Sequence, residues 1–289
     1  MPKGLDIRRA DRGDLHVMIE WAAREGWNSS LHDAACFHAA DPEGFWIARQ
    51  EGELAACISL VSYSPAFAFL GFYIAHPDFR RQGIGHALWK HSLAACPATT
   101  VGLDGVIDQQ ENYQKSGFTL AHRNIRYGSI PRSGVEKPDG LVQISSEHLG
   151  AIATYDQTFF AAPRTAFLAS WLGATGHVGY MHHVDGAITG YGIIRPCRDG
   201  YKIGPLFAEN AETAARLLDA LGPHSAGKPM FLDSPELNSA AVDLCSRHGL
   251  EPVFETARMY RGPAPALPLD MTFEITSFEL GYIGFRFWT

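Results

Sequence analysis

The sequence has few cysteines and groups none of them in a short motif. The five cysteines are scattered over 289 residues, odd in number, and without a Cys-x-x-Cys spacing. This usage is typical of reduced thiols and argues against a disulfide framework. We therefore expect a cytoplasmic protein, and we expect no metal site.

Long runs of one chemical character are also missing. No block of Lys and Arg is longer than a pair, the formal net charge is -7, and the isoelectric point is about 6.0. These values argue against nucleic acid or an anionic membrane surface as a partner. No amino-terminal apolar leader and no apolar run of about 18 residues occurs, which argues against secretion and membrane spanning. A small cationic partner fits the acidic balance better.

The length and the hydrophobic content predict two domains. The chain has 289 residues, of which 46% are hydrophobic, and a single domain usually has about 100 to 200 residues. The hydrophobic pattern of residues 1–128 predicts an α+β unit in the order strand, helix, hairpin, strand, helix, strand, helix, strand. Residues 128–140 have the Gly, Ser and Pro content of a linker, and residues 140–289 form the second unit.

Two pairs of landmarks suggest that the second half repeats the first. "EGELAAC" begins at 51 and "DGAITGY" at 185, both as hairpin turns, while "YQKSGF" ends at 118 and "CSRHGL" at 250. Nearly equal offsets indicate a duplication. A final strand is predicted over 271–280, and the aromatic tail at 281–289 is expected to dock on its own domain or on a partner.

The segment "YIAHPDFRRQGIGHALWK" at 73–90 joins an apolar strand to a helix through two arginines and a Gly-x-Gly. A helix amino terminus presents unpaired N–H groups and partial positive charge, so the junction predicts a phosphate or pyrophosphate site. A Rossmann fingerprint needs glycine where Leu88 stands, and a P-loop needs Gly-Lys-Ser/Thr, which is absent. The second half has no such glycine pair or arginines before its corresponding helix, so we expect that copy to lack the anion site.

Arg80, Gly83 and Gly85 match the pattern Arg/Gln-x-x-Gly-x-Gly/Ala, and at this point the sequence resembles the GNAT acetyltransferase superfamily. "NYQKSGF", about thirty residues further on, is similar to the tyrosine-bearing helix of that family. The resemblance covers residues 5–127, and the second half resembles a degenerate GNAT-like domain. It implies an α+β fold of two tandem GNAT-like domains, each a mixed, mostly antiparallel sheet flanked by helices. Residues 1–128 would be catalytic, and residues 140–289 would lack the CoA pyrophosphate loop.

The resemblance implies acetyl-CoA as the acyl donor and assigns residues to hold it. The loop would bind the pyrophosphate through backbone N–H groups, and the end of the preceding strand would bind the pantetheine and the thioester carbonyl. The residues assigned in this way are Tyr73, Ile74, Ala75, Arg80, Arg81, Gln82, Gly83, Ile84, Gly85, His86 and Asn112.

For catalysis, the resemblance makes Tyr113 the general acid that protonates the leaving thiolate. Transfer from a phenol with a pKa of about 10 to a thiol with a pKa of about 8.5 is feasible with positioning. Asp104, His76 and a water relay remain open as the acceptor of the amine proton. Trp27 and Asn28 are predicted to line the acceptor pocket, since an aromatic ring with a nearby acid suits a cationic amine.

The prediction is therefore an N-acetyltransferase in which a primary amine of a small molecule attacks acetyl-CoA directly. A regulatory module that binds acyl-CoA without turnover is an alternative, as is acetylation of a protein amine. A further alternative assigns residues 140–289 to formation of a homodimer and to completion of the acceptor site. The identity of the amine is left open by the sequence.

Overall fold

The computed structural model describes residues 3–30, 32–131, 138–160 and 162–280. The first half forms four helices and six strands, namely α1 (Arg12–Arg24), α2 (Asp33–Ala40), α3 (Ile84–Ala95), α4 (Gln110–Lys115), β1 (Leu5–Arg9), β2 (Phe45–Gln50), β3 (Glu53–Ser64), β4 (Phe67–Ala75), β5 (Thr100–Val106) and β6 (Thr119–Ser129). Short 3₁₀ turns follow β4 (Pro77–Phe79) and β5 (Ile107–Gln109).

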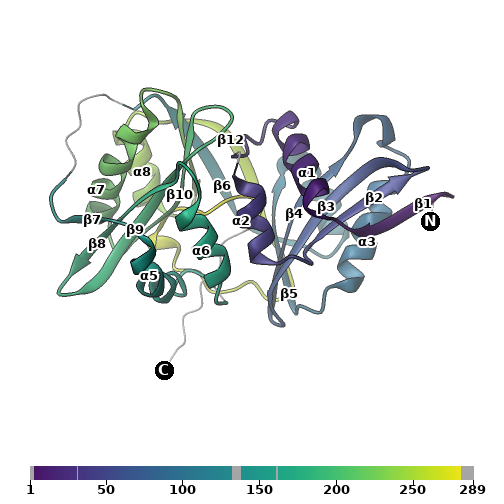
Figure 1. Ribbon diagram of the computed structural model, residues 1–289, viewed down its shortest axis with the longest axis horizontal. Helices are drawn as coiled ribbons and strands as arrows, with labels where there is room; N and C mark the ends of the chain where they lie inside the picture. Colours follow the sequence, from purple (N-terminus) through teal and green to yellow (C-terminus); the bar gives the residue numbers. More distant parts are fainter. Residues whose placement is uncertain (1–2, 31, 132–137, 161, 281–289) are drawn as a thin grey trace.

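The second half has the same order of elements: β7 (Leu141–Gln143), α5 (Leu149–Asp156), α6 (Thr165–Gly173), β8 (Val178–Val184), β9 (Ala187–Pro196), β10 (Tyr201–Ala208), α7 (Ala211–Leu221), β11 (Met230–Pro235), α8 (Ser239–Arg247), β12 (Glu251–Arg261) and β13 (Thr272–Glu274). The remaining 3₁₀ turns span Ser146–His148, Gly222–Ser225 and Leu269–Met271. The predicted α+β fold with two tandem units is confirmed (Figure 1).

Local sequence signals account for the main elements. Asp11 caps α1, where its side chain accepts a hydrogen bond from the backbone N–H of Asp14 (2.9 Å) and the Asp14 side chain accepts one from the N–H of Asp11 (3.0 Å). The two predicted hairpin turns have the same backbone, since Glu51 and Asp185 have φ of 52° and 50° and each precedes a glycine with positive φ. Such left-handed pairs are the turns that join twisted antiparallel strands.

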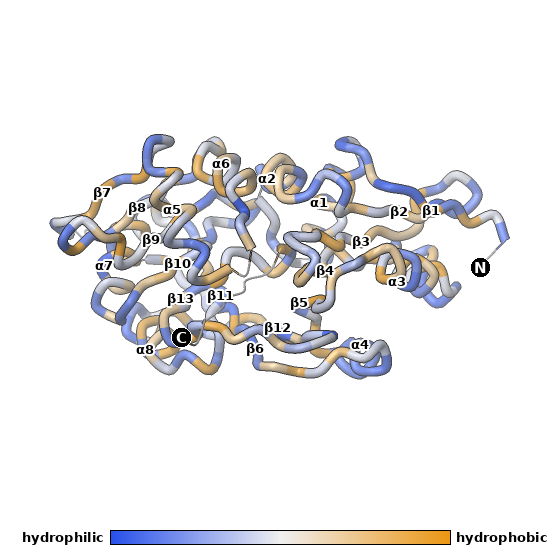
Figure 2. The backbone as a smooth tube through the Cα atoms, turned by 90° about the horizontal axis from the view of Figure 1, so that it is seen from below, coloured by the Kyte–Doolittle hydropathy of each residue, from blue (hydrophilic) through white to orange (hydrophobic). Residues whose placement is uncertain are grey.

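One sheet runs through both halves. In the described part of the chain its strand order is β1-β2-β3-β4-β5-β12-β6-β11-β10-β9-β8-β7, with β13 on β10. In the edge-on view, α1, α2 and α6 lie along one face of the sheet, and α4 and α8 lie along the other (Figure 2). No helix among the described residues has the length and apolar character needed to cross a membrane.

The two halves exchange their last long strands. β12, from the second half, pairs with β5, and β6, from the first half, pairs with β11. The division of the chain at residues 128–140 therefore remains a prediction about sequence units, because in space each unit is completed by a strand of the other. Residues 132–137 of the predicted linker lie outside the described residues.

A buried ion pair marks each exchange. Arg258 on β12 faces Asp104 on β5 in register, and its guanidinium holds the carboxylate with two hydrogen bonds of 2.7 and 2.6 Å. Arg126 on β6 faces Asp233 on β11 in the same way, at 2.5 and 2.7 Å. Bidentate pairs of this kind fix orientation as well as contributing energy. The repetition of the pair supports the duplication inferred from the sequence.

The halves also share a hydrophobic core. One cluster of buried side chains contains residues of α1, α2, α5 and α6 together with strands of both halves. At its centre the rings of Phe37 on α2 and Trp171 on α6 stack, with centroids 6.3 Å apart. Burial of the apolar side chains in this shared cluster stabilises the contact between the two halves.

Candidate active site

A slot opens in the sheet where β4 and β5 separate. The two strands pair in parallel from Phe67 with Thr100 to Leu70 with Leu103, and no pairing between them follows. A break in register between β4 and β3 occurs at the same point, where Phe72 has a φ of 46°. On the side towards β5, the backbone from Tyr73 to Ala75 therefore has no strand partner, although Ile74 and Ala75 still pair with β3. Groups that face the slot need a hydrogen-bonding ligand or water.

Two cavities meet at this slot. The larger, of about 530 Å³, passes between β4 and β5 towards the loop after α1, and the smaller, of about 350 Å³, lies between α3 and α4. Tyr73, Gln109 and Tyr113 line both cavities. A donor that enters between α3 and α4 and an acceptor that enters on the α1 side would thus meet beside Tyr113.

Tyr113 is packed in place with its hydroxyl group left available. Its ring stacks on Trp89 at 5.6 Å, and Trp89 in turn contacts Tyr73 at 4.9 Å. Gly105 lies against the Tyr113 ring so closely that a Cβ there would collide with it. No hydrogen bond joins the Tyr113 hydroxyl to any described residue. Burial raises the pKa of Tyr113 well above the ordinary value and raises the pKa of Tyr73 to about 12, so both phenols are protonated donors at neutral pH.

The loop before α3 has the shape of an anion site. Arg81 and Gly83 are left-handed, with φ of 66° and 78°, and Gly83 is the N-cap of α3. The first helical hydrogen bond runs from the Ala87 N–H to the Gly83 carbonyl, so the N–H groups before Ala87 point out of the helix end. Gly85 packs against the Tyr73 hydroxyl, where a Cβ would lie 3.1 Å away.

The other residues assigned to acyl-CoA are distributed around these cavities. His86 and Asn112 line the smaller cavity, and Ile74, Ala75 and Arg80 line the larger one. Arg80 pairs with Glu25 and donates a hydrogen bond to the carbonyl of Ala75, and all three residues line the larger cavity. Arg81, Gln82 and Ile84 belong to the loop and the first turn of α3, and their predicted role in binding stays a prediction.

Gly83→Val is expected to reduce acyl-CoA affinity about five- to thirtyfold, because a β-branched residue disfavours the left-handed conformation by about 1 to 2 kcal/mol and the loop would lose its shape. The matched control is Gly186→Val, since Gly186 has a φ of 82° and open space around it but lies in the β8–β9 hairpin. Calorimetric titration with acetyl-CoA should show weakened binding for Gly83→Val alone. Equal binding by the two variants would contradict the assignment of the loop.

The acceptor side of the larger cavity combines both halves of the chain. Glu25 and Trp27 come from the end of α1 and the loop after it, Phe254 from β12, and Phe278 and Glu279 from the segment after β13. The rings of Phe254 and Phe278 lie 6.1 Å apart. The second half thus contributes directly to the cleft of the first.

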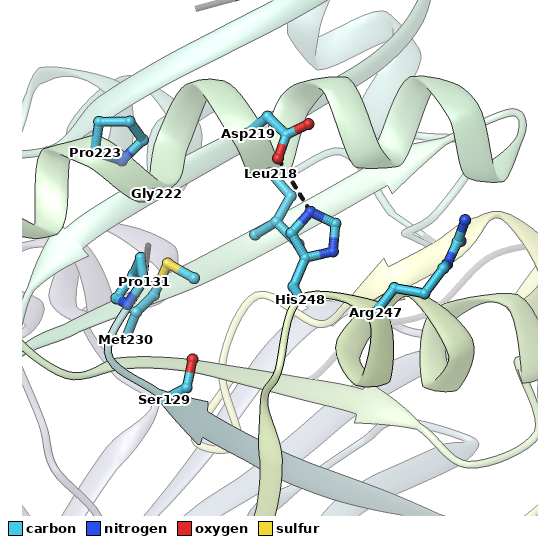
Figure 3. A pocket seen from close by; sticks show the side chains of 9 residues that line it. All are labelled: Ser129, Pro131, Leu218, Asp219, Gly222, Pro223, Met230, Arg247 and His248. Atoms are coloured by element: carbon cyan, nitrogen blue, oxygen red, sulfur yellow. Dashed lines mark hydrogen bonds and ion pairs between the residues drawn. The ribbon is translucent and has the colours of Figure 1, made fainter. Parts of the chain in front are cut away.

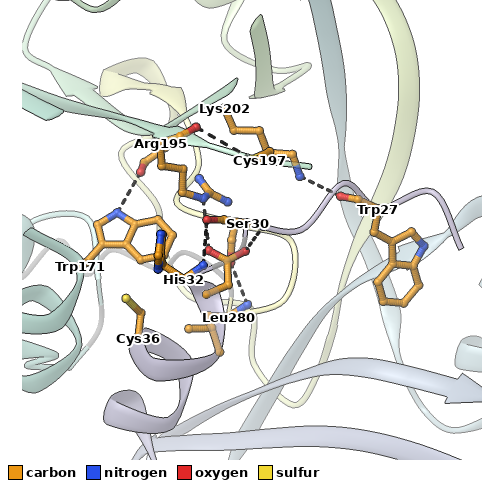
Figure 4. Close-up of polar contacts among 12 residues, drawn as sticks. Trp27, Ser30, His32, Cys36, Trp171, Arg195, Cys197, Lys202 and Leu280 are labelled. Atoms are coloured by element: carbon orange, nitrogen blue, oxygen red, sulfur yellow. Dashed lines mark hydrogen bonds and ion pairs between the residues drawn. The ribbon is translucent and has the colours of Figure 1, made fainter. Parts of the chain in front are cut away.

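The predicted acceptor residues are held by the second half. Lys202 on β10 donates a hydrogen bond to the carbonyl of Trp27 (2.8 Å), and the Trp27 indole points away from Lys202 (Figure 4). Asn28 exchanges two hydrogen bonds with the backbone of Asp199, at 2.7 and 2.9 Å. Asn28 lines a neighbouring cavity with Arg126 and Phe254, and Trp27 alone of the two lines the reaction cavity. Their roles towards a substrate stay predictions.

Asp104 lines the larger cavity, and its carboxylate already accepts hydrogen bonds. Both of its carboxylate oxygens accept hydrogen bonds from Arg258, and one also accepts from Asn124 at 2.8 Å. Its side chain is 0% exposed. Burial raises the pKa of Asp104 while Arg258 opposes that shift. If Asp104 took up a substrate proton, its pair with Arg258 would break. The geometry therefore favours a positioning role for Asp104, and its role as the base stays a prediction.

His76 belongs to the turn that leads into the loop. Its backbone N–H bonds to Ala55, its ring packs on Trp21 at 5.3 Å, and its Nδ1 lies 3.6 Å from Asp78. These contacts fit the turn, and His76 is not among the residues that line either cavity.

The corresponding slot in the second half is filled by the chain itself. β10 and β11 pair in parallel only at Tyr201–Lys202 with Met230–Phe231, and β13 then pairs with β10. The Ser234 hydroxyl bonds to the Phe273 carbonyl at 2.8 Å, fixing β13 beside β11. The predicted strand over 271–280 was too long, because only Thr272–Glu274 pairs before the chain leaves the sheet. The predicted role of the tail at 281–289 lies outside the described residues.

The helix end in the second half is closed as well. The Asn210 side chain caps α7 by accepting a hydrogen bond from the Thr213 N–H (2.9 Å), which removes a donor that α3 leaves open. The cavity of about 200 Å³ in this half lies at the other ends of α7 and α8, where His248 bonds to Asp219 at 3.0 Å (Figure 3). The described residues that line it include no tyrosine.

Comparisons with known proteins agree with this geometry. A profile of the Acetyltransferase (GNAT) family matches residues 14–118, and one of the Acetyltransferase (GNAT) domain matches residues 152–273. Holothin acyltransferase of Pseudoalteromonas sp. is 33% identical over 269 residues, which are 93% of this chain and 92% of that protein.

Solved structures share the fold. A Pyrococcus horikoshii protein described as an acetyltransferase superposes with a TM-score of 0.83 at 20% identity, over 97% of each chain. A tandem GNAT protein from the clavulanic acid biosynthesis pathway superposes with a TM-score of 0.61 at 17% identity, over 90% of this chain and 99% of its own. Two α+β units, one with an open slot and one with a filled slot, thus make a tandem GNAT protein. The chain belongs to the GNAT family of acyltransferases, which use acyl-CoA donors.

Proposed function

We propose that the protein transfers an acetyl group from acetyl-CoA to a primary amine of a small molecule. The observation that carries the proposal is the Tyr113 hydroxyl, which is without a partner among the described residues where the donor and acceptor cavities meet. Tyr73 to Ala75 supply backbone groups for the pantetheine and the thioester carbonyl. The loop from Arg81 to His86 supplies N–H groups for the pyrophosphate.

In the proposed reaction the neutral amine attacks the thioester carbon directly. A C–N bond forms, the C–S bond breaks, and Tyr113 gives its proton to the departing sulfur. The proton that the nitrogen loses as the amide forms restores the Tyr113 hydroxyl. Backbone N–H groups beside the slot stabilise the negative charge that develops on the carbonyl oxygen. No covalent intermediate on the protein is needed, so none of the five cysteines has a role in the chemistry.

The small size of the acceptor has two supports. Phe254 and Phe278 line one side of the cavity with rings of the second half. The relative that is 33% identical bears the name holothin acyltransferase, which makes holothin the first amine to test. The acyl group is a separate variable, so acetyl-CoA is compared with longer acyl-CoAs.

The test is release of free CoA thiol by the purified chain with each acyl-CoA, holothin and a set of small amines, with the product identified by mass. Turnover with a small amine supports the proposal. Binding of acyl-CoA without turnover would favour the regulatory module, and turnover only with a peptide amino group would favour a protein substrate.

Acyl-CoA should bind with a stoichiometry of one per chain. The β13 strand and the Asn210 cap occupy the places in the second half that are open in the first. Calorimetric titration of acetyl-CoA into the full chain measures the number of sites, and two sites per chain would contradict the closed second slot.

A further inference from the structure

We propose that Glu279, carried by the segment after β13, binds the ammonium group of the acceptor and takes its proton. This inference rests on the proposed function, because it assigns the proton acceptor of that same reaction. The structural basis is a glutamate that lines the cleft of the first half and is delivered there by the last described residues of the second half.

The path of this segment is fixed by contacts on both sides. After β13 the chain crosses β4 at Gly71, where the Glu279 carbonyl occupies the space that a Cβ would need. The Tyr63 hydroxyl then donates a hydrogen bond to the Leu280 carbonyl at 2.8 Å, and the Leu280 side chain is fully buried. Gly71 stands where β4 leaves β5, so the crossing places Glu279 at the mouth of the slot.

Among the described carboxylates that line this cavity, Glu279 is the one that is both buried and without a hydrogen-bond or ion-pair partner. It is 3% exposed, and no hydrogen bond or ion pair joins its carboxylate to another described residue. Glu25 is paired with Arg80, Asp104 is held by Arg258, and Asp108 lies on the exposed rim. A buried carboxylate without a partner is costly, and a bound cation removes that cost.

The charged groups around Glu279 are already committed to other partners. Arg126 is paired with Asp233, Arg195 with Asp33, and Lys202 with the Trp27 carbonyl. Glu279 lies close enough to all three cations, and to the carboxylate of Asp33, to interact with them electrostatically. Each of these cations is held by another partner, so the Glu279 carboxylate is left for the cation of a substrate.

The aromatic walls beside Glu279 match a cationic amine on an apolar body. Trp27, Phe254 and Phe278 line the same cavity, and aromatic faces attract an ammonium group. In the reaction, one ammonium proton moves to Glu279 and the nitrogen lone pair attacks the thioester carbon. The C–S bond breaks as Tyr113 protonates the sulfur. The second nitrogen proton, lost as the amide forms, restores the Tyr113 hydroxyl, and Glu279 passes its proton to solvent.

The test compares two acceptors in one variant, Glu279→Gln. For an amine with a pKa of about 10, kcat/KM should fall about 10²- to 10⁴-fold, because the proton acceptor is lost. For a similar amine that is already neutral at the assay pH, the loss should be about tenfold or less. Acetyl-CoA affinity should be unchanged. Both rates come from one preparation, so their ratio does not depend on the folded fraction.

Glu274→Gln is the matched control, since Glu274 is 1% exposed on the same segment but does not line the cavity. It should keep the ratio of the two rates at the wild-type value. An equal loss for both amines in Glu279→Gln, or no loss, would overturn the assignment while leaving the proposed function intact. A wild-type chain that acetylates no amine would instead overturn the proposed function and this inference with it.

Discussion

Replacing Tyr113 by phenylalanine is expected to lower kcat for acyl transfer about 10²- to 10³-fold while leaving acetyl-CoA affinity within about twofold, because the change removes a proton donor and keeps the packing. The ring stacks on Trp89 and lies against Gly105, and phenylalanine preserves both contacts. Only the hydroxyl at the junction of the two cavities is lost. The thiolate would then leave without a proton donor.

The measurement combines steady-state kinetics with calorimetric titration of acetyl-CoA. Tyr127→Phe serves as control, since Tyr127 is a buried tyrosine that packs in the core of the second half. It should retain wild-type rates. A kcat for Tyr113→Phe within threefold of wild type would exclude the general-acid role, and a loss of affinity as large as the loss of rate would indicate a binding role.

Arg258→Met is expected to lower the free energy of unfolding by about 3 to 5 kcal/mol, because it leaves the buried carboxylate of Asp104 without its cation. The Asp104 and Arg258 side chains are both 0% exposed, so water cannot replace the lost partner. The pair joins β5 to β12, which is the point where the second half completes the first sheet. Urea unfolding followed by tryptophan fluorescence measures the change.

The double variant Asp104→Leu with Arg258→Met separates charge from packing. Removing both partners leaves no unpaired charge, so most of the lost stability should return. A single-variant loss below about 1 kcal/mol would show that the pair is unimportant for holding the exchanged strand.

Local patterns in the sequence predict most elements but do not predict which half of the sheet receives β6 or β12. The capping pair Asp11 and Asp14, the turns at Glu51 and Asp185, and the glycine loop before α3 are signals within a few residues, and each is found in the structure. β6 and β12 follow similar helices and end in similar residues, so either strand suits either position. The exchange is decided by tertiary pairing, which periodicity does not report.

The candidate site divides in the same way. The loop at Gly83 and Gly85 and the helix of Tyr113 are continuous motifs, so the sequence points to them directly. Phe254, Phe278 and Glu279 enter the cleft from more than a hundred residues away. One local signal existed, since an isolated glycine in an apolar strand, such as Gly71, indicates the close approach of another backbone.

The exchange of β6 and β12 has the arrangement of a domain-swapped dimer, with both copies joined in one polypeptide. In two separate chains, such an exchange depends on protein concentration, whereas a covalent connection makes it independent of concentration. Two copies joined in this way need only one working slot between them. The second copy is then free to change its use, and here its Phe254, Phe278 and Glu279 line the larger cavity of the first copy.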